Sequence, residues 1–76
     1  MDVTVKLFAN YRQGRYETSR ESLREGSTVG HILDSLKLDL ENDPIGILLV
    51  NGRHASPEQK LSDGDVVSIF PMLGGG

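Results

Sequence analysis

The amino-acid sequence predicts an α+β fold, in which one main helix packs on one face of a mixed sheet of four to five strands. Residues 3–7 alternate apolar and polar side chains, as a strand with one buried face does, and residues 66–70 have an apolar strand pattern. Between these segments runs an apolar stripe at helical spacing, formed by Val29, Ile32, Leu33 and Leu36. Because 76 residues make one small domain, a single helix must cover a single sheet face.

A β-hairpin is predicted at the start of the chain. The strand over residues 3–7 directs its apolar side chains to the core and leaves Phe8 on the opposite face. Residues 10–14 are polar and end in a glycine, which indicates a turn. A second strand with a weaker pattern follows over residues 16–23.

The helix is expected to begin after Ser27 or Thr28, because either side chain can cap the free N–H groups of the first turn. It ends near Lys37, where a cation suits the C-terminal end of the helix dipole. Gly30 weakens the helix by up to about 1 kcal/mol relative to alanine, and a close packing contact with the sheet would explain it. Residues 38–44 carry acids but lack the glycine and closing glutamate of a calcium loop, so a solvated connector is expected.

The second half of the chain predicts further strands joined by turns. Residues 45–50 (IGILLV) form the most apolar run and are interpreted as a central strand. The Asn-Gly pair at 51–52 is a strong two-residue hairpin signal, and residues 53–55 form the short returning strand. Residues 56–59 are interpreted as a capped helical turn with Pro57 at its first helical position.

The last strand follows a turn at residues 62–65, and Leu61 anchors the segment before it to the core. Its residues alternate between the two sheet faces, with Val67 and Ile69 on one face and Val66, Ser68 and Phe70 on the other. The sheet face that the helix leaves free therefore receives Phe70.

An exposed apolar patch is expected on this free face, with Phe8 and Phe70 in it. One apolar pair from residues 45–50 joins them, either Ile47 with Leu49 or Leu48 with Val50. A patch of this size suggests a partner protein. The alternative is that these side chains complete the core beneath a loop.

Composition excludes several classes of function. The net charge of −3 argues against nucleic-acid binding and suits a partner with a basic cleft. The absence of cysteine removes disulfides, thiolate metal sites and thiol nucleophiles.

No apolar run approaches the length of a membrane span and no signal-peptide pattern is present, so a cytoplasmic location without membrane contact is expected. His31 and His54 are isolated, so neither a metal site nor a catalytic residue is predicted. Arg12 and Arg15 either pair with acids of a partner or belong to a solvated loop.

The chain ends in three glycines. Because glycine has no β-carbon, Gly74, Gly75 and Gly76 form a thin string that can enter a channel closed to other side chains. The predicted domain therefore covers residues 1–71, and residues 72–76 form a flexible C-terminal tail. Frayed ends and artificial additions also leave terminal glycines, so the tail alone does not decide the function.

Several motifs occur in order along the chain: VKLFA at 5–9, YR at 11–12, EGSTV at 25–29, VNG at 50–52, LSDGDVV at 61–67, FP at 70–71 and the terminal glycines. Together they resemble the β-grasp sulfur-carrier family, which includes the small subunit of molybdopterin synthase, the thiamine-pathway sulfur carrier and, more distantly, ubiquitin. The resemblance implies a β-grasp fold. The family usually ends in two glycines, so Gly75 and Gly76 carry the match and Gly74 is additional. The FP pair is more similar to the molybdopterin branch than to the thiamine branch.

The resemblance implies a sulfur carrier without catalytic residues or bound cofactors of its own. An E1-like enzyme would use ATP to adenylate the Gly76 carboxylate, and a persulfide or sulfide would displace AMP to leave a thiocarboxylate. Gly74, Gly75 and Gly76 would thread into the active site of a second enzyme, of the molybdopterin synthase large-subunit type or the thiazole synthase type. Partners would dock on a surface formed by Phe8, Phe70, Pro71, Met72 and Leu73.

Two alternatives are compatible with the same sequence. A ubiquitin-like modifier would join the activated Gly76 to a lysine amine instead of to sulfide. A β-grasp interaction module would bind partners through its apolar patch and leave the tail inert. The sequence also leaves open which pathway receives the sulfur, whether that of molybdenum or tungsten cofactor, of thiamine or of another metabolite.

Overall fold

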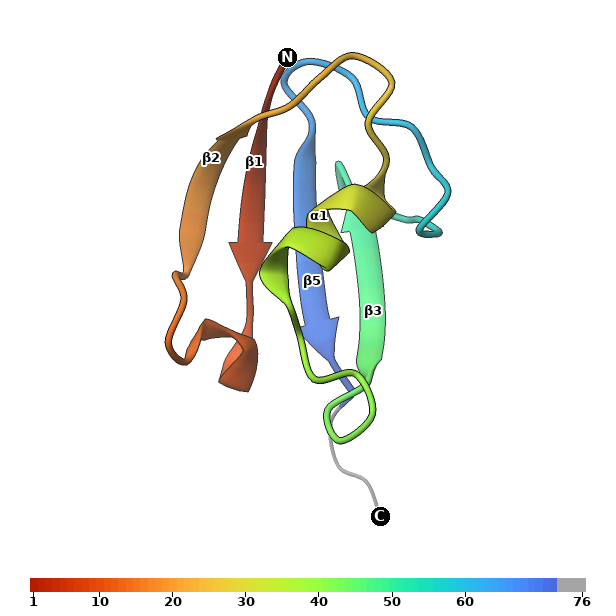
Figure 1. The fold of residues 1–76 in the computed structure, drawn as a ribbon. Helices are drawn as coiled ribbons and strands as arrows, with labels where there is room; N and C mark the ends of the chain where they lie inside the picture. Colours follow the sequence, from red (N-terminus) through yellow and green to blue (C-terminus); the bar gives the residue numbers. More distant parts are fainter. Residues whose placement is uncertain (73–76) are drawn as a thin grey trace.

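The computed structural model describes residues 1–72 and contains a five-stranded sheet with one α-helix packed across one face (Figure 1). This confirms the predicted α+β class, the mixed sheet and the single main helix. Along the chain the elements are β1 (Asp2–Leu7), the 3-10 helix η1 (Ala9–Arg12), β2 (Thr18–Ser22), α1 (Val29–Leu36), β3 (Ile45–Val50), β4 (Arg53–His54) and β5 (Val66–Pro71).

The strand order in the sheet is β2-β1-β5-β3-β4. Strand β1 is antiparallel to β2 and parallel to β5, while β3 is antiparallel to both β5 and β4. Strand β5 lies at the middle of this order, and β3 lies between β5 and β4. Residues 45–50 therefore form an interior strand of the sheet, as predicted. The run IGILLV is apolar throughout because Leu48 and Val50 face the core while Ile47 and Leu49 face the opposite side.

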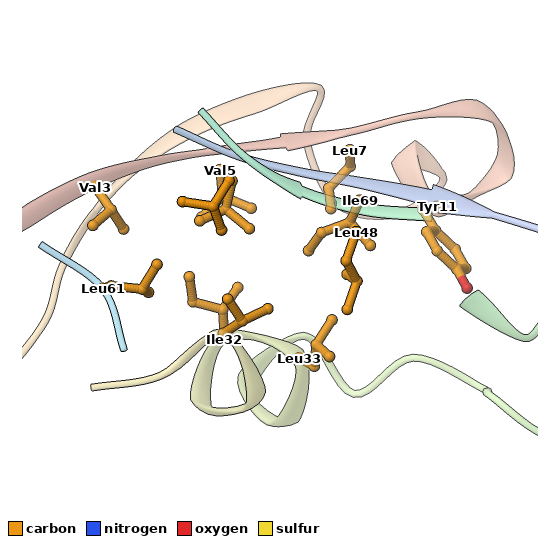
Figure 2. Close-up of a cluster of buried hydrophobic side chains, with 12 residues drawn as sticks. Val3, Val5, Leu7, Tyr11, Ile32, Leu33, Leu48, Leu61 and Ile69 are labelled. Carbon is orange, nitrogen blue, oxygen red and sulfur yellow. The ribbon is translucent and has the colours of Figure 1, made fainter. Parts of the chain in front are cut away.

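The hydrophobic core lies between the sheet and α1, as Figure 2 shows. Valine and leucine side chains from β1, β3 and β5 point toward the helix, and Ile32 and Leu33 of α1 point back toward them. Leu61 is only 5% exposed, which confirms that it anchors its segment to the core. The fully buried side chains of β1 and β5 are Val3, Val5, Leu7, Val67 and Ile69, as the period-two pattern predicts.

Helix α1 begins and ends as the sequence predicts. Thr28 is the N-cap, and Nδ1 of His31 accepts the backbone N–H of Thr28 at 3.0 Å, which completes a capping box. Lys37 closes the helix in a left-handed conformation with φ of 52°. The expected contact of Gly30 with the sheet is wrong. A β-carbon on Gly30 would instead lie 3.1 Å from the carbonyl oxygen of Pro57, which also accepts the Gly30 N–H at 2.8 Å.

Three loop segments differ from the sequence prediction. The turn at residues 10–14 includes most of η1, whose Tyr11 is only 1% exposed. Residues 56–59 form a hydrogen-bonded turn and not a helical turn, because the Gln59 N–H bonds to the Ser56 carbonyl and the chain then extends into a bridge at Lys60. Strand β2 is shorter than predicted, since the pairing with β1 begins only at Thr18. Among the described residues, no helix has the length and apolar character needed to cross a bilayer.

Candidate functional site

An apolar patch occupies the sheet face opposite α1, at the end where β5 finishes. The aromatic rings of Phe8 and Phe70 stack with their centroids 4.0 Å apart and their planes 9° from parallel. Ile47 pairs with Phe70 across β3 and β5 and is 43% exposed, and Leu49 is half-buried beside them. The predicted patch is therefore present, with Ile47 and Leu49 as the pair from β3. We call Phe8, Ile47, Leu49 and Phe70 the apolar patch.

Strand register brings these side chains together. Leu7 is opposite Ile69 in the parallel pair, and the Phe8 N–H bonds to the Ile69 carbonyl at 3.3 Å, which sets Phe8 beside Phe70. Because side chains alternate between faces, the same register that buries Leu7 and Ile69 presents the two phenylalanines on the free face. Each aromatic ring therefore has a neighbour from a segment far away in sequence.

Arg12 supports the patch from η1. Its Nε donates to the Leu7 carbonyl at 2.8 Å, its guanidinium carbon lies 5.4 Å from the centre of the Phe8 ring, and its Nη2 lies 3.7 Å from a carboxylate oxygen of Glu17. Beside this stack is a shallow hollow of about 190 Å³, lined by Lys6, Leu7, Phe8, Arg12, Glu17 and Thr18. Arg12 thus makes contacts within the protein, and its guanidinium is also partly exposed.

Arg15 has a different role. Its guanidinium donates to the carbonyls of Tyr11 and Gln13 and to those of Leu36 and Lys37 at the end of α1. These bonds satisfy helix-terminal acceptors that would otherwise lack a partner in the helix. Arg15 therefore joins the loop after η1 to the helix.

The segment that leads into the glycine tail is held against the start of β3. The Met72 N–H bonds to the Pro44 carbonyl at 2.8 Å, and Ile45 pairs with Pro71. A β-carbon on Gly46 would lie 2.8 Å from the Pro71 carbonyl oxygen and 2.9 Å from the Met72 α-carbon, so only glycine fits there without a backbone shift. The sequence did signal this position, because a glycine inside an apolar strand marks a bulge or a close backbone approach.

The 3-10 helix η1 holds the connector at residues 38–44 through hydrogen bonds. The Tyr11 hydroxyl donates to the Asp43 carbonyl at 2.7 Å, and the Asn10 amide donates to the Asp43 carboxylate. Asn42 donates to both carboxylate oxygens of Asp39, which lowers the pKa of that carboxyl. Asp39 thus accepts hydrogen bonds from within the connector and Asp43 accepts one from η1, and within residues 1–72 no three side chains of metal-binding type gather.

The described part of the predicted docking surface consists of Phe8, Phe70, Pro71 and Met72. Phe8 and Phe70 lie together, and Met72 is 60% exposed directly after β5. Pro71 is buried, so its side chain offers little area to a partner, and its role is to continue β5. Leu73, Gly74, Gly75 and Gly76 lie outside the described residues.

Comparison with known families gives a match to the ThiS family over residues 5–76. The chain belongs to the ThiS family. No curated protein matches this ThiS-family chain significantly.

Solved structures similar to this ThiS-family chain include two kinds of protein. A Pyrococcus furiosus protein assigned as subunit 1 of molybdopterin converting factor is 30% identical, with a TM-score of 0.78 over 93% of this chain and 97% of that one. Small archaeal modifier protein 1 of Haloferax volcanii is 29% identical, with a TM-score of 0.74 over 92% of this chain and 95% of that one.

A third similar structure contains a complex. It is that of subunits 1 and 2 of molybdopterin-converting factor from Helicobacter pylori, whose matching chain is 25% identical, with a TM-score of 0.65 and full coverage of both chains. Together with the family match, these structures confirm the resemblance to β-grasp sulfur carriers.

Away from the apolar patch, the ThiS-family chain has a larger polar hollow of about 560 Å³ at the β3–β4 turn. Asp65 in this hollow has both carboxylate oxygens occupied, one by the Asn51 amide and the other by the Ser62 N–H. Asn51 in turn accepts the Val66 N–H at 2.9 Å. This network fixes the Asn-Gly turn against the start of β5, which is a structural role.

Proposed function

We propose that this protein is a sulfur carrier whose Gly76 carboxylate is activated and converted to a thiocarboxylate. One observation carries the proposal: β5 passes through the apolar patch at Phe70 and leads directly into the glycine tail. A partner docked on the patch would therefore lie beside the point where the tail begins. Membership of the ThiS family supports the same conclusion.

The proposed chemistry takes place in two steps at Gly76. A carboxylate oxygen attacks the α-phosphorus of ATP and releases pyrophosphate, which gives an acyl-adenylate with AMP as a good leaving group. Sulfide then attacks the carbonyl carbon and displaces AMP, leaving the thiocarboxylate. When the donor is a persulfide, the product is an acyl disulfide, which a thiol must then reduce to the thiocarboxylate.

The division of labour places catalysis in partner enzymes. An E1-like enzyme binds ATP and performs the adenylation, and a second enzyme receives the tail residues Gly74, Gly75 and Gly76 and takes the sulfur. We favour an acceptor of the molybdopterin synthase type over one of the thiazole synthase type, because two of the similar structures are molybdopterin-converting factor subunits. The proposed location is the cytoplasm, where ATP and these enzymes would be available.

The test is an intact mass spectrum of the protein after reaction with the E1-like enzyme from its own genome, ATP and sulfide. The expected result is a mass gain equal to the exchange of one oxygen for one sulfur, mapped by fragmentation to Gly76. A control that omits ATP should show no gain. An unmodified mass with an enzyme shown to be competent on another carrier would reject the proposal.

A second candidate function is protein modification, which the similarity to small archaeal modifier protein 1 favours. The same activated Gly76 would then be attacked by a lysine amine, forming an amide bond. Adducts larger than the free chain that resist thiol reductants would support this function. If removal of Gly75 and Gly76 left partner binding intact and no activation occurred with the full chain, an interaction module would be the better description.

A further inference from the structure

Lys6 lies on the same sheet face as the apolar patch. It pairs with Ser68 of β5 on one side and with Thr18 of β2 on the other, so its side chain projects from the face that bears Phe8 and Phe70. Together with Phe8 and Arg12 it lines the hollow of about 190 Å³ beside the aromatic stack. The hollow and the patch therefore share a boundary at Phe8.

The other charges on this part of the face are already paired. The Arg12 guanidinium lies 3.7 Å from Glu17, and the Arg20 guanidinium lies 3.8 Å from Asp2. Lys6 has no carboxylate within ion-pair distance among residues 1–72. The hollow thus carries a local excess of positive charge on a protein whose net charge is −3.

A partner that covers the apolar patch would remove water from the Lys6 ammonium. A partner that packs on the Phe8–Phe70 stack also covers the adjoining hollow and removes water from the Lys6 ammonium. An unpaired ammonium without water is costly, whereas one that receives a carboxylate in a good geometry is not. A partner that lacks an acid at this position would therefore be rejected.

We propose that the hollow at Lys6 receives a carboxylate side chain of the partner enzyme, next to an apolar side chain that packs on Phe8 and Phe70. This inference rests on the proposed function, because it names the chemistry of the surface that docks the activating enzyme. It differs from the basic cleft expected from the net charge of the whole chain. On the face that bears the apolar patch, the partner would present an acidic residue, although the net charge of the whole chain is −3.

The test uses ATP–pyrophosphate exchange by the E1-like enzyme from the same genome, measured against the concentration of the carrier. Lys6→Glu should raise the KM for the carrier about tenfold and leave kcat unchanged, since it places like charges together at the interface. Lys6→Gln should have a smaller effect in the same direction. Lys60→Glu is the matched control, because it changes the net charge equally at an exposed side chain on the β3–β4 hollow and should leave KM unchanged.

Calorimetric binding to the same enzyme without ATP separates the two proposals. If wild-type carrier supports no exchange but binds, and Lys6→Glu weakens binding, the adenylation proposal fails and the interface proposal stands. If Lys6→Glu binds as well as wild type, or both Glu variants bind more tightly, the interface proposal is overturned. Absence of wild-type binding also overturns it. Thermal unfolding of each variant should match wild type, because both lysines are exposed.

Discussion

At Gly46 a missing β-carbon allows β3 to lie directly against the chain that follows β5. The nearest atoms to an added β-carbon are backbone atoms of Pro71 and Met72, at 2.8–3.0 Å, and backbone cannot rotate away as a side chain would. We expect Gly46→Ala to lower the free energy of unfolding by about 1–3 kcal/mol, which is typical of overpacking. Urea denaturation followed by circular dichroism measures this loss.

Gly14→Asn provides the control for that prediction. A β-carbon at Gly14 meets no atom within 4 Å, and asparagine tolerates the positive φ of 71° at this position. The variant should unfold close to wild type. Equal stability of Gly46→Ala and wild type would show that the chain after β5 does not depend on this close approach.

Tyr11 makes stability depend on pH in the alkaline range. Burial, together with the nearby Asp43 carboxylate, raises the pKa of Tyr11 above its ordinary value of about 10. The folded state therefore holds the phenol proton more tightly than the unfolded state does. Its contribution is fully present below about pH 10 and is lost as the pH rises through the folded pKa. Burial also raises the pKa of Tyr16, which adds to the same trend.

The measurement is the free energy of unfolding of wild type and Tyr11→Phe in urea, at neutral pH and near pH 11. The variant should be about 1 kcal/mol less stable at neutral pH, because it loses the hydroxyl bond to the Asp43 carbonyl. The difference between the two proteins should shrink at the higher pH. A constant difference would show that Tyr11 does not titrate differently in the folded and unfolded states.

At the scale of the elements, the sheet face opposite α1 carries the apolar patch. Ile47→Ser should raise the KM for the carrier in the activation reaction by about tenfold, because it removes an exposed apolar side chain from the apolar patch. Leu40→Ser is a close control, since Leu40 is 44% exposed and Ile47 is 43% exposed, but Leu40 lies in the connector. Similar KM values for the two variants would argue against docking through the patch.

The elements show why the sequence predicted most of the fold but not the order of its strands. The two faces of β1 and β5 and the stripe in α1 predicted those elements almost to the residue, because each has one buried face. In β3 the apolar patch on the second face produces the continuous apolar pattern of a strand buried on both sides. Periodicity reports burial and shared faces, but it does not report which strands become neighbours.

For the whole molecule, the proposed function makes the C-terminal carboxylate indispensable while the domain stays intact. A chain with one alanine added after Gly76 should keep the thermal stability of wild type, because the buried core residues that the structure describes all precede Pro71. It should form no thiocarboxylate, since the activated group would sit on a different residue with a side chain. Intact mass spectrometry reports the product, and a modified extended chain would contradict the proposed role of Gly76.

The candidate site was only partly predictable. The sequence predicted that Phe8 and Phe70 lie on one face, because side chains alternate between the two faces in both the first and the last strand. It could not place Arg12 over Phe8 or Lys6 beside a hollow, since both depend on how η1 folds back after β1. It also assigned Pro71 to the docking surface, whereas the period of β5 continues through that residue and buries it.

The hydrogen bond from Met72 to Pro44 limits how far the protein can extend its terminal group. From that anchor to Gly76 the chain spans residues 73–76, which even when fully extended cover about 13–14 Å at 3.3–3.6 Å per residue. Under the proposed function, an enzyme that acts on Gly76 with this anchor intact must hold its reacting atoms within that radius of Met72. The same upper limit would then apply to every partner, for the distance between the surface that binds the domain and the site of the chemistry.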